Sequence, residues 1–410
     1  MNYVSTYLVC LMLVSSSLFS KKLKEGNYRG ILILNEVAGI ELPFNFTVKY
    51  KGKKPLIIIR NAEERIVVDE ISIKKDSLKF KMPVFDTEFQ LVRVGDNLEG
   101  VWINHYKNTN NILKFKATYG EDKRFLQLPG KANPIFEDKW EVTFSPGNED
   151  SSKAIGIFHH IEQTDYVTGT FLTETGDYRY LEGMKSGNKL YLSTFDGSHA
   201  FLFTAEYSNN KIIIGRFYSG SAWRENWIGK RNAAFKLRDA EEISFVKNPD
   251  EKINFTFPNV EGKKITLLDK RYENKPLIIQ IMGSWCPNCM DESVYFASIY
   301  KQYKAQGLEI IALAFEKTTD FEKAKTQVMR MKTRLKIDYE ILLTLQTGKD
   351  KASETLSALN KITAFPTTLF LNKEHKAVKV HTGFSGPATG KEYEIYKQRT
   401  ENLIKSLLKE

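Results

Sequence analysis

The sequence predicts a multidomain protein in which an all-β N-terminal region, made of two antiparallel β modules, is followed by an α/β domain. Three observations support this fold class. The chain has 410 residues, which exceeds the size of one typical domain. Up to Leu237 hydrophobic and polar residues alternate in short runs, whereas after Asp239 apolar strand-like runs alternate with helical segments. A hydrophobic fraction of 42% suffices for packed cores in all three parts.

The first twenty residues are a candidate export signal. Val4 to Phe19 is almost wholly apolar or small, and Lys21-Lys22 follows Ser20. About sixteen such residues are short for a membrane span but suit the apolar core of a secretory signal peptide. No Lys or Arg precedes the run, and Leu18 makes the cleavage pattern irregular. Residues 1–20 are therefore a signal peptide or a membrane anchor, and both predict an exported protein of the periplasm or cell envelope.

The basic charge of the chain does not indicate a nucleic-acid partner. The formal net charge of +10 is spread along the sequence and is not gathered into one block. A solvated surface is the preferred interpretation, with loose attraction to anionic envelope surfaces or acidic partners as the alternative. Zinc-ligand spacing, an arginine-rich helix and an aromatic RNA-binding signature are all missing from the sequence.

Two β modules are predicted at residues 23–128 and 138–238. Alternation with a period of two, typical of strands with one buried face, is clear at residues 44–50 and 201–207. Turn signals such as Gly95-Asp96-Asn97 separate such runs. The region also repeats itself weakly, and the paired motifs are Phe80-x-Met82-x-x-Phe85 with Leu190-x-Leu192-x-x-Phe195, Leu98-x-Gly100 with Ile213-x-Gly215, and Tyr28 with Trp140. Two related modules, or coincidence among β-rich sequences, explain the repeat.

A charged linker at residues 239–252 leads to the predicted α/β domain at residues 253–410. A hairpin is expected at residues 255–267. Buried or paired strands are expected at 276–282, 308–315, 339–343, 367–372 and 377–381. Helices are expected from the cysteines to residue 306, and at 319–336, 351–360 and 391–408, of which the second is charged and predicted to be exposed.

The cysteines indicate redox chemistry. Cys10 lies in the apolar leader, so cleavage would leave Cys286 and Cys289, separated by two residues. A disulfide between them closes a ring that is too small to stabilise the fold by linking distant segments. Such a closely spaced pair is typical of redox-active cysteines. A zinc site is disfavoured because no second pair of ligands at zinc-binding spacing follows the cysteines. Only His375 and His381 follow them, and no other cysteine does. We expect no metal and no cofactor, because the two sulfurs carry the electrons themselves.

The position of the pair predicts the role of each sulfur. The segment Trp285-Cys286-Pro287-Asn288-Cys289 follows a predicted buried strand and opens a helix. A cysteine at a helix start faces unpaired backbone N–H groups, which stabilise the thiolate. Cys286 is thus the predicted attacking sulfur, and Cys289, one turn further, is the predicted resolving sulfur. Pro287 suits the first helical turn, where its missing N–H costs nothing.

Trp285 to Cys289, together with Phe365-Pro366-Thr367-Thr368 about eighty residues later, resembles the TlpA/ResA-like branch of the thioredoxin superfamily. The resemblance covers roughly residues 250–410 and implies a thioredoxin fold with Pro366 as a cis-proline facing the sulfurs. It also implies that Glu292 assists proton transfer, although a solvent-facing helix acid is the alternative. Gln280 lies where cytoplasmic thioredoxins have an aspartate, and an amide cannot act as a base.

The resemblance implies an envelope thiol-disulfide oxidoreductase of the reductase type. Its substrates would be disulfide-bearing envelope proteins, and a membrane thiol relay would regenerate it. Two alternatives stay open: a thiol peroxidase of the redoxin type, and a binding protein whose β modules carry the main function. The carboxylates Glu174, Asp177 and Glu182 lie in a turn-rich stretch, but nothing in the sequence fixes the separation that glycoside hydrolysis requires.

Overall fold

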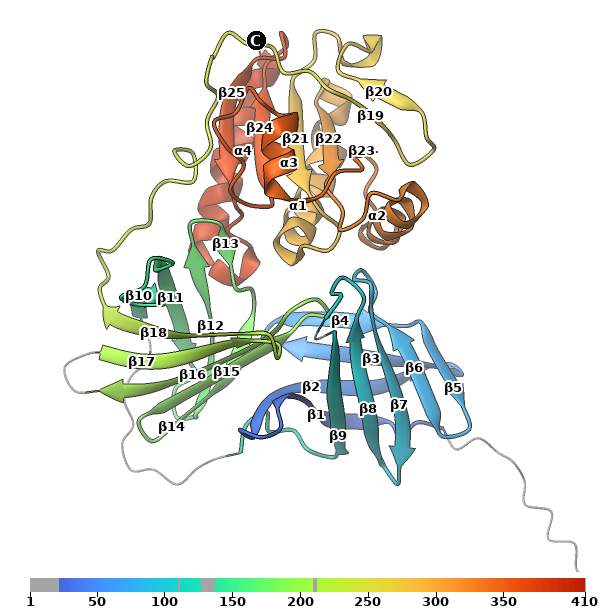
Figure 1. Cartoon of the computed structure of the whole chain (residues 1–410), viewed down its shortest axis with the longest axis vertical. Helices are drawn as coiled ribbons and strands as arrows, with labels where there is room; N and C mark the ends of the chain where they lie inside the picture. Colours follow the sequence, from blue (N-terminus) through green and yellow to red (C-terminus); the bar gives the residue numbers. More distant parts are fainter. Residues whose placement is uncertain (1–21, 110, 127–135, 137, 209–211, 410) are drawn as a thin grey trace, which may run out of the picture.

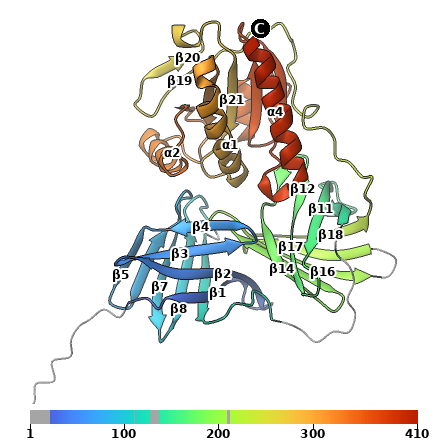
Figure 2. The same cartoon turned by 180° about the vertical axis from the view of Figure 1, so that it is seen from behind.

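The structure is a computed structural model that describes residues 22–109, 111–126, 136, 138–208 and 212–409. Figures 1 and 2 both show the C-terminal α/β domain lying across two β modules. The fold class predicted from the sequence is therefore confirmed. Within the described residues, no helix combines the length and the apolar character needed to cross a membrane. The predicted signal peptide or anchor at residues 1–20 lies outside the described residues.

The first β module is one antiparallel sheet with the strand order β4-β3-β2-β1-β9-β8-β7-β6-β5. Its last strand returns to pair with its first, so that β1 lies between β2 and β9. The strands are β1 (Gly26–Asn35), β2 (Ile40–Lys51), β3 (Lys54–Asn61), β4 (Glu64–Val68), β5 (Ile71–Lys74), β6 (Ser77–Lys81), β7 (Thr87–Val94), β8 (Asn97–Asn104) and β9 (Ile112–Tyr119).

The second β module follows the same plan. Its last strand, β18, pairs with its first, β10, and β12 also pairs with β11, so the sheet closes on itself. The strands are β10 (Asp138–Phe144), β11 (Ser152–His160), β12 (Tyr166–Thr173), β13 (Gly176–Asp177), β14 (Leu181–Ser186), β15 (Lys189–Phe195), β16 (Ala200–Ser208), β17 (Ile212–Ser219) and β18 (Trp223–Arg231).

The sequence repeat coincides with this shared plan. Tyr28 and Trp140 lie in the opening strands β1 and β10. Gly100 and Gly215 lie in β8 and β17, each the strand before the closing strand. The motif that begins at Phe80 starts in β6 and continues beyond it, and the motif that begins at Leu190 lies in β15; each of these strands is three strands before the end of its module. The paired motifs therefore occupy equivalent strands in two modules of like topology.

The two β modules share part of a core. Phe195, at the end of β15 in the second module, is fully buried, and its ring stacks on Phe44 of the first module with centroids 4.6 Å apart. Trp102 of the first module meets the same ring edge-on at 5.4 Å. Aromatic pairs of this kind stabilise a contact beyond the area that they bury. The modules are thus joined by packed side chains as well as by the chain itself.

The C-terminal domain has a sheet of strand order β23-β22-β21-β24-β25. Strands β21 to β23 are parallel, and β24 runs antiparallel to both β21 and β25. Side chains of α1, α2 and α4 pack on one face of the sheet, while α3 packs on the other. The strands are β19 (Thr256–Pro258), β20 (Lys264–Thr266), β21 (Leu277–Met282), β22 (Glu309–Ala314), β23 (Glu340–Leu343), β24 (Thr367–Leu371) and β25 (Ala377–Thr382).

Three of the four expected helices lie within a few residues of their expected bounds, whereas the helix expected at 351–360 begins and ends earlier, at Gly348–Thr355. Strand β21 is buried along its whole length, as its apolar sequence predicts for the centre of a sheet covered on both faces. The helices are η1 (Lys270–Tyr272), α1 (Pro287–Tyr303), η2 (Lys304–Gln306), α2 (Phe321–Leu335), α3 (Gly348–Thr355), η3 (Pro387–Thr389) and α4 (Lys391–Lys409).

The charged sequence of helix α2 predicts an exposed helix, but part of its surface packs against the first β module. Arg334 forms an ion pair of 3.0 Å with Asp69 of the first β module. Arg330 donates to the backbone oxygen of Met82 over 2.9 Å. Arg330 and Arg334 therefore face the first β module. Arginine suits this position because its guanidinium can bind both carboxylates and backbone oxygens across a domain boundary. The segment before β19 also docks on the C-terminal domain, where Ile243 is buried.

Candidate redox site

Cys286 and Cys289 form a disulfide at the start of α1, with Cα atoms 5.2 Å apart. Cys286 caps the helix in an extended backbone conformation, and Pro287 occupies the first helical turn. The backbone N–H of Cys289 donates to Sγ of Cys286 over 3.2 Å. Helix-start N–H groups and the helix dipole favour negative charge at this point. The local geometry therefore suits a Cys286 thiolate in the reduced protein.

The loop that contains Pro366 lies next to the cysteine pair. The Phe365–Pro366 peptide bond is cis. Sγ of Cys286 lies 3.5 Å from the backbone oxygen of Phe365, and the backbone N–H of Gly383 donates to the oxygen of Pro366 over 2.8 Å. The fold thus brings together two motifs about eighty residues apart in the sequence, and backbone polar groups border the sulfur.

Trp285 forms one wall of the site. Its indole N–H donates to the backbone oxygen of Phe315 over 3.0 Å, and its ring meets Phe365 edge-on with centroids 5.7 Å apart. The ammonium of Lys317 lies 3.8 Å from the centre of the indole ring, in a cation–π contact. These contacts fix the ring in one orientation beside Cys286.

Glu292 is fully buried, which excludes the alternative that it is a solvent-facing helix acid. Its carboxylate accepts hydrogen bonds from Gln280 (2.9 Å), Thr368 (2.9 Å) and Tyr396 (3.1 Å). Burial raises the pKa of Glu292 to about 7, although these three hydrogen bonds favour the charged form. Gln280 also lies 3.5 Å from the backbone oxygen of Cys289. A carboxyl group with a raised pKa is therefore held close to the first turn of α1, which contains Cys289.

Glu316 is a second buried acid that the sequence analysis missed. Its carboxylate accepts from the backbone N–H of Ser284 (2.8 Å) and from the Ser284 hydroxyl (2.7 Å). Burial raises its pKa to about 7. Ser284 follows the carboxyl end of β21, and Glu316 follows the carboxyl end of the neighbouring parallel strand β22. These two strand ends meet at one edge of the sheet. That shared position was the signal in the sequence, and Glu316 supports the turn that leads to Cys286.

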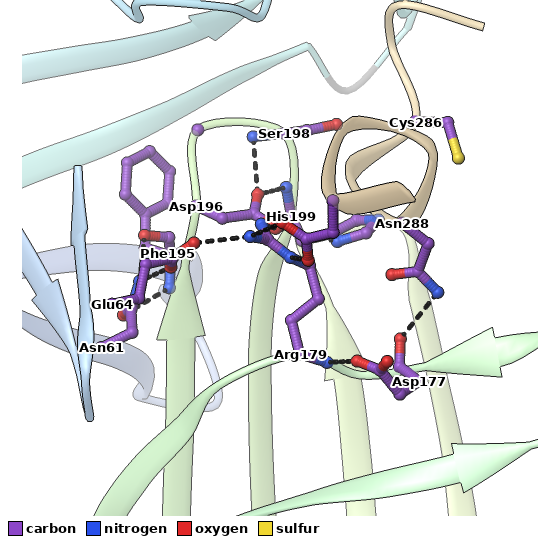
Figure 3. A network of polar contacts seen from close by, with 12 residues as sticks. Asn61, Glu64, Asp177, Arg179, Phe195, Asp196, Ser198, His199, Cys286 and Asn288 are labelled. Carbon is purple, nitrogen blue, oxygen red and sulfur yellow. Dashed lines mark hydrogen bonds and ion pairs between the residues drawn. The ribbon is translucent and has the colours of Figure 1, made fainter. Parts of the chain in front are cut away.

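The second β module also reaches the redox site, which nothing in the sequence indicated. The side-chain amide of Asn288 donates to the backbone oxygen of Asp177 over 3.1 Å (Figure 3). The Ser198 hydroxyl donates to the backbone oxygen of Trp285 over 3.1 Å. Two loops of this module therefore contact the residues before and after Cys286 in the sequence. They are residues 175–179, which include the two-residue strand β13, and residues 196–199.

Arg179 anchors the first of these loops. Its guanidinium binds both carboxylate oxygens of Asp291 in α1 at 2.9 and 3.0 Å. It also pairs with Glu64 of the first module (2.5 Å) and Asp196 of the second (3.1 Å). Burial alone would lower the pKa of Arg179, but Asp291, Glu64 and Asp196 outweigh it and raise the pKa. One fully buried cation thus connects both β modules to the helix that begins at the cysteine pair (Figure 3).

The three acids grouped in the sequence do not converge. Asp177 lies beside the redox site and accepts from the backbone N–H of Gly386 over 2.5 Å. Glu182 pairs with Arg124 at 3.0 Å. Glu174 lies near Arg238. Among the described residues these carboxylates form no acid–base pair, and no group of three or more His, Cys, Asp or Glu is arranged to hold a metal ion.

Both cysteines are largely covered. The predicted role of Cys286 as the attacking sulfur requires access from solvent, yet only 6% of its surface is exposed, and Cys289 is fully buried. Cys286 is more exposed than Cys289, as expected for an outer and an inner cysteine. The small exposed fraction of Cys286 differs from that of a sulfur that projects freely from the helix tip.

Comparison with known proteins shows which proteins the C-terminal domain is similar to. Residues 249–380 match the model of the AhpC/TSA family. Thiol-disulfide oxidoreductase ResA of Halalkalibacterium halodurans is 29% identical over 140 residues, which cover 34% of this chain and 71% of that protein. The ResA protein of Bacillus subtilis is 31% identical over 130 residues, which cover 32% of this chain and 64% of that protein.

Solved structures with a similar fold include two from Bacteroides. A thiol-disulfide oxidoreductase from Bacteroides fragilis is 19% identical, and the match covers 35% of this chain and 99% of that one, with a TM-score of 0.28. The thioredoxin domain of a thiol-disulfide oxidoreductase from Bacteroides vulgatus is 17% identical, covering 38% and 99%, with a TM-score of 0.29.

The family model matches the part of the chain in which the cysteine pair, the cis-proline loop and the parallel strands occur together. We conclude that this part of the chain is TlpA/ResA-like, with a thioredoxin-like fold and similarity to thiol-disulfide oxidoreductases.

Proposed function

We propose that this protein exchanges disulfides with partner proteins of the cell envelope through Cys286 and Cys289, and that it acts as a reductase. One observation carries the proposal. Cys286 lies at the N-terminus of α1 with its Sγ 3.5 Å from the backbone oxygen of Phe365, next to the cis-proline loop. This arrangement favours a thiolate and offers backbone groups with which an extended substrate can pair.

The reaction follows from the two sulfurs. The Cys286 thiolate attacks one sulfur of the partner disulfide, the partner S–S bond breaks, and a mixed disulfide forms while the second partner sulfur leaves as a thiolate. Cys289 then loses its proton and attacks Sγ of Cys286. The mixed disulfide breaks, the partner leaves with two thiols, and the Cys286–Cys289 disulfide closes. Two electrons have passed from the cysteine pair to the partner.

Glu292 is the proposed acceptor of the Cys289 proton. Its carboxyl group has a pKa of about 7, and Gln280 contacts both Glu292 and the backbone of Cys289. A base with a pKa near the working pH is the most efficient one for such a transfer. Glu292 accordingly serves the resolving step, in which the buried thiol must ionise.

Reduction of partners requires that the pair be reduced again from outside. A membrane thiol relay is the proposed donor, and the apolar segment at residues 4–19 supports export to the compartment where such a relay operates. The curated relatives named thiol-disulfide oxidoreductase ResA support the class of reaction. A thiol peroxidase of the redoxin type is not favoured, because these relatives carry the oxidoreductase name.

The proposal is tested by trapping the intermediate. Replacing Cys289 with Ser should stop the reaction at the mixed disulfide, so that partners stay covalently bound to Cys286 and appear as adducts on non-reducing gels. The full-length Cys286→Ser chain is the matched control and should give no adducts. If Cys289→Ser yields no adducts from envelope extracts and wild-type protein reduces no disulfide at all, the proposed function is wrong.

A further inference from the structure

The attacking sulfur is covered, although it lies at a helix tip. Cys286 is 6% exposed, while Trp285 and Asn288 on either side of it are only partly buried. Attack on a disulfide requires the incoming sulfur to reach Sγ of Cys286 directly, so whatever covers this sulfur decides which disulfides react. The surroundings of Cys286 are of interest because the second β module binds two of its neighbours, Trp285 and Asn288.

The loop of residues 175–179, from the second β module, is packed closely against the redox site. The backbone oxygen of Asp177 accepts from Asn288, and its carboxylate accepts from the N–H of Gly386. A Cβ atom on Gly383 would lie 2.6 Å from the carbonyl carbon of Thr175, and one on Gly176 would lie 2.2 Å from the amide nitrogen of Asn288. The loop therefore contacts both α1 and the segment that follows β25.

A second contact of the same module involves the residue that precedes Cys286 in the sequence. Ser198 donates to the backbone oxygen of Trp285, the residue before the cysteine. A Cβ atom on Gly197 would lie 2.6 Å from Cε of Met82 in the first module, so this loop is wedged between that module and the redox site. Residues before and after Cys286 are thus both bound to the second β module.

The buried ion pairs of Arg179 hold the cover in place. The guanidinium is fully buried and connects Asp291 of α1 with Glu64 and Asp196 of the two modules. Removing a cation from such a site leaves three carboxylates facing one another across the domain boundary, which favours separation. Arg179 is therefore a positioning residue, since it acts through the loop and not on the sulfur.

We propose that the loop of residues 175–179 and Ser198 form a selective cover over Cys286, which admits small disulfides and disulfides on extended polypeptide segments and excludes those of folded proteins. The inference rests on the proposed function, because it names the substrate class of that same site. It gives the second β module a role in the redox reaction: the module restricts which disulfides reach the thiolate.

The test compares a small and a large disulfide on the full-length chain. Wild type, Arg179→Gln and Asp177→Ala are assayed with an aromatic disulfide, 5,5′-dithiobis(2-nitrobenzoate), and with insulin. Lys153→Ala is the matched control, since it breaks a surface ion pair with Glu141 in the same module. The quantity measured is the ratio of the insulin rate to the small-disulfide rate. A change in the reduction potential affects both rates and leaves the ratio nearly constant.

We expect Arg179→Gln to raise this ratio by at least about tenfold, because the variant loses a buried cation that contacts three carboxylates and the loss of even one such contact shifts a closed–open equilibrium by that factor. Asp177→Ala should raise it less, because Arg179 still anchors the loop, and Lys153→Ala should leave it unchanged. An unchanged ratio in both loop variants, with circular dichroism showing that they are folded, would overturn the inference.

Wild-type protein provides a measurement without substitution. Relative to a free thiol, reduced Cys286 should react readily with iodoacetamide and much more slowly with a maleimide coupled to a folded carrier protein. Equal protection factors for the two reagents would contradict a size-selective cover. If wild type reduces neither disulfide, the proposed function itself fails. If it reduces both, and the loop variants do not change their ratio, only the cover is wrong.

Discussion

Glu292 shows how burial prepares a single residue for chemistry. The ordinary pKa of a glutamate is near 4.5, and burial raises that of Glu292 to about 7. A carboxyl group with a raised pKa stabilises the folded state fully below pH 4.5, and this contribution is lost as the pH rises through about 7. The fold therefore gives up stability at neutral pH to keep a titrating acid near Cys289.

Replacing Glu292 with Gln should remove the inflection near pH 7 from the rate at which the mixed disulfide resolves. At pH 8 the rate should fall at least about tenfold, because a positioned base contributes ~10²–10⁴ to a proton transfer. Stopped-flow measurement of the resolving step between pH 5 and 9 checks this. Glu394→Gln, on the exposed face of α4, is the control and should retain the wild-type profile. An unchanged profile in Glu292→Gln would exclude Glu292 as the base.

Tyr396 should tune this titration. Its hydroxyl donates to Glu292 over 3.1 Å and so favours the charged carboxylate. Tyr396→Phe removes that bond and should shift the pH midpoint of resolution upward, by less than about one unit for one hydrogen bond of ~1 kcal/mol. Tyr393→Phe, on the same helix, is the matched control. A midpoint that moves down, or moves equally in both variants, would contradict the assignment.

At the scale of residues, the sequence predicted what is local and missed what is distant. Cys286, Cys289 and Pro287 form one short motif, so their positions could be inferred from spacing. Pro366 and Glu292 followed from the resemblance to the TlpA/ResA-like branch. Arg179 could not be inferred, because its partners Glu64 and Asp291 lie more than a hundred residues away and only the folded chain brings them together.

Among the elements, the equivalent glycines of the two modules show why the repeat persists. A Cβ atom on Gly215 in β17 would lie 2.2 Å from the indole ring of Trp227, which is fully buried in β18. One on Gly100 in β8 would lie 2.1 Å from the backbone oxygen of Gln90. In each module the strand before the closing strand thus needs a residue without a side chain at the same place.

Gly215→Ala should lower the free energy of unfolding by about 1–3 kcal/mol, the usual cost of adding a methyl group to a well-packed core. Urea denaturation monitored by tryptophan fluorescence measures the change. Ile214→Ala is the neighbouring control; Ile214 is 52% exposed and should cost much less. An equal decrease in the free energy of unfolding in the two variants would contradict the claim that Trp227 leaves no room for a side chain at position 215.

Element types were predicted better than element contacts. Alternation with a period of two identified β2 and β16, and the apolar run at residues 276–282 identified β21, because each pattern reports one strand's burial. Helix α2 looked exposed because its charges suit water as well as a partner surface. Its ion pair with Asp69 depends on where the first β module lies, which periodicity does not encode.

On the scale of the whole molecule, the three parts of the chain form one connected unit. Phe195 joins the cores of the two β modules, and the network of Arg179 joins both modules to α1. The loops of the second module then border the redox site on two sides. The sequence left the role of the β modules open, and their contacts with the cysteine motif are the basis of the role in substrate selection that we propose.

The central claim is that Cys286 is the attacking thiolate and Cys289 the buried partner. The alkylation rate of each cysteine by iodoacetamide, followed by mass spectrometry against pH on the reduced full-length chain, tests it most directly. We predict that Cys286 reacts first, with a midpoint below the ~8.5 of a free cysteine, and that Cys289 stays protected. Preferential reaction of Cys289, or a Cys286 midpoint at or above that of free cysteine, would contradict the account.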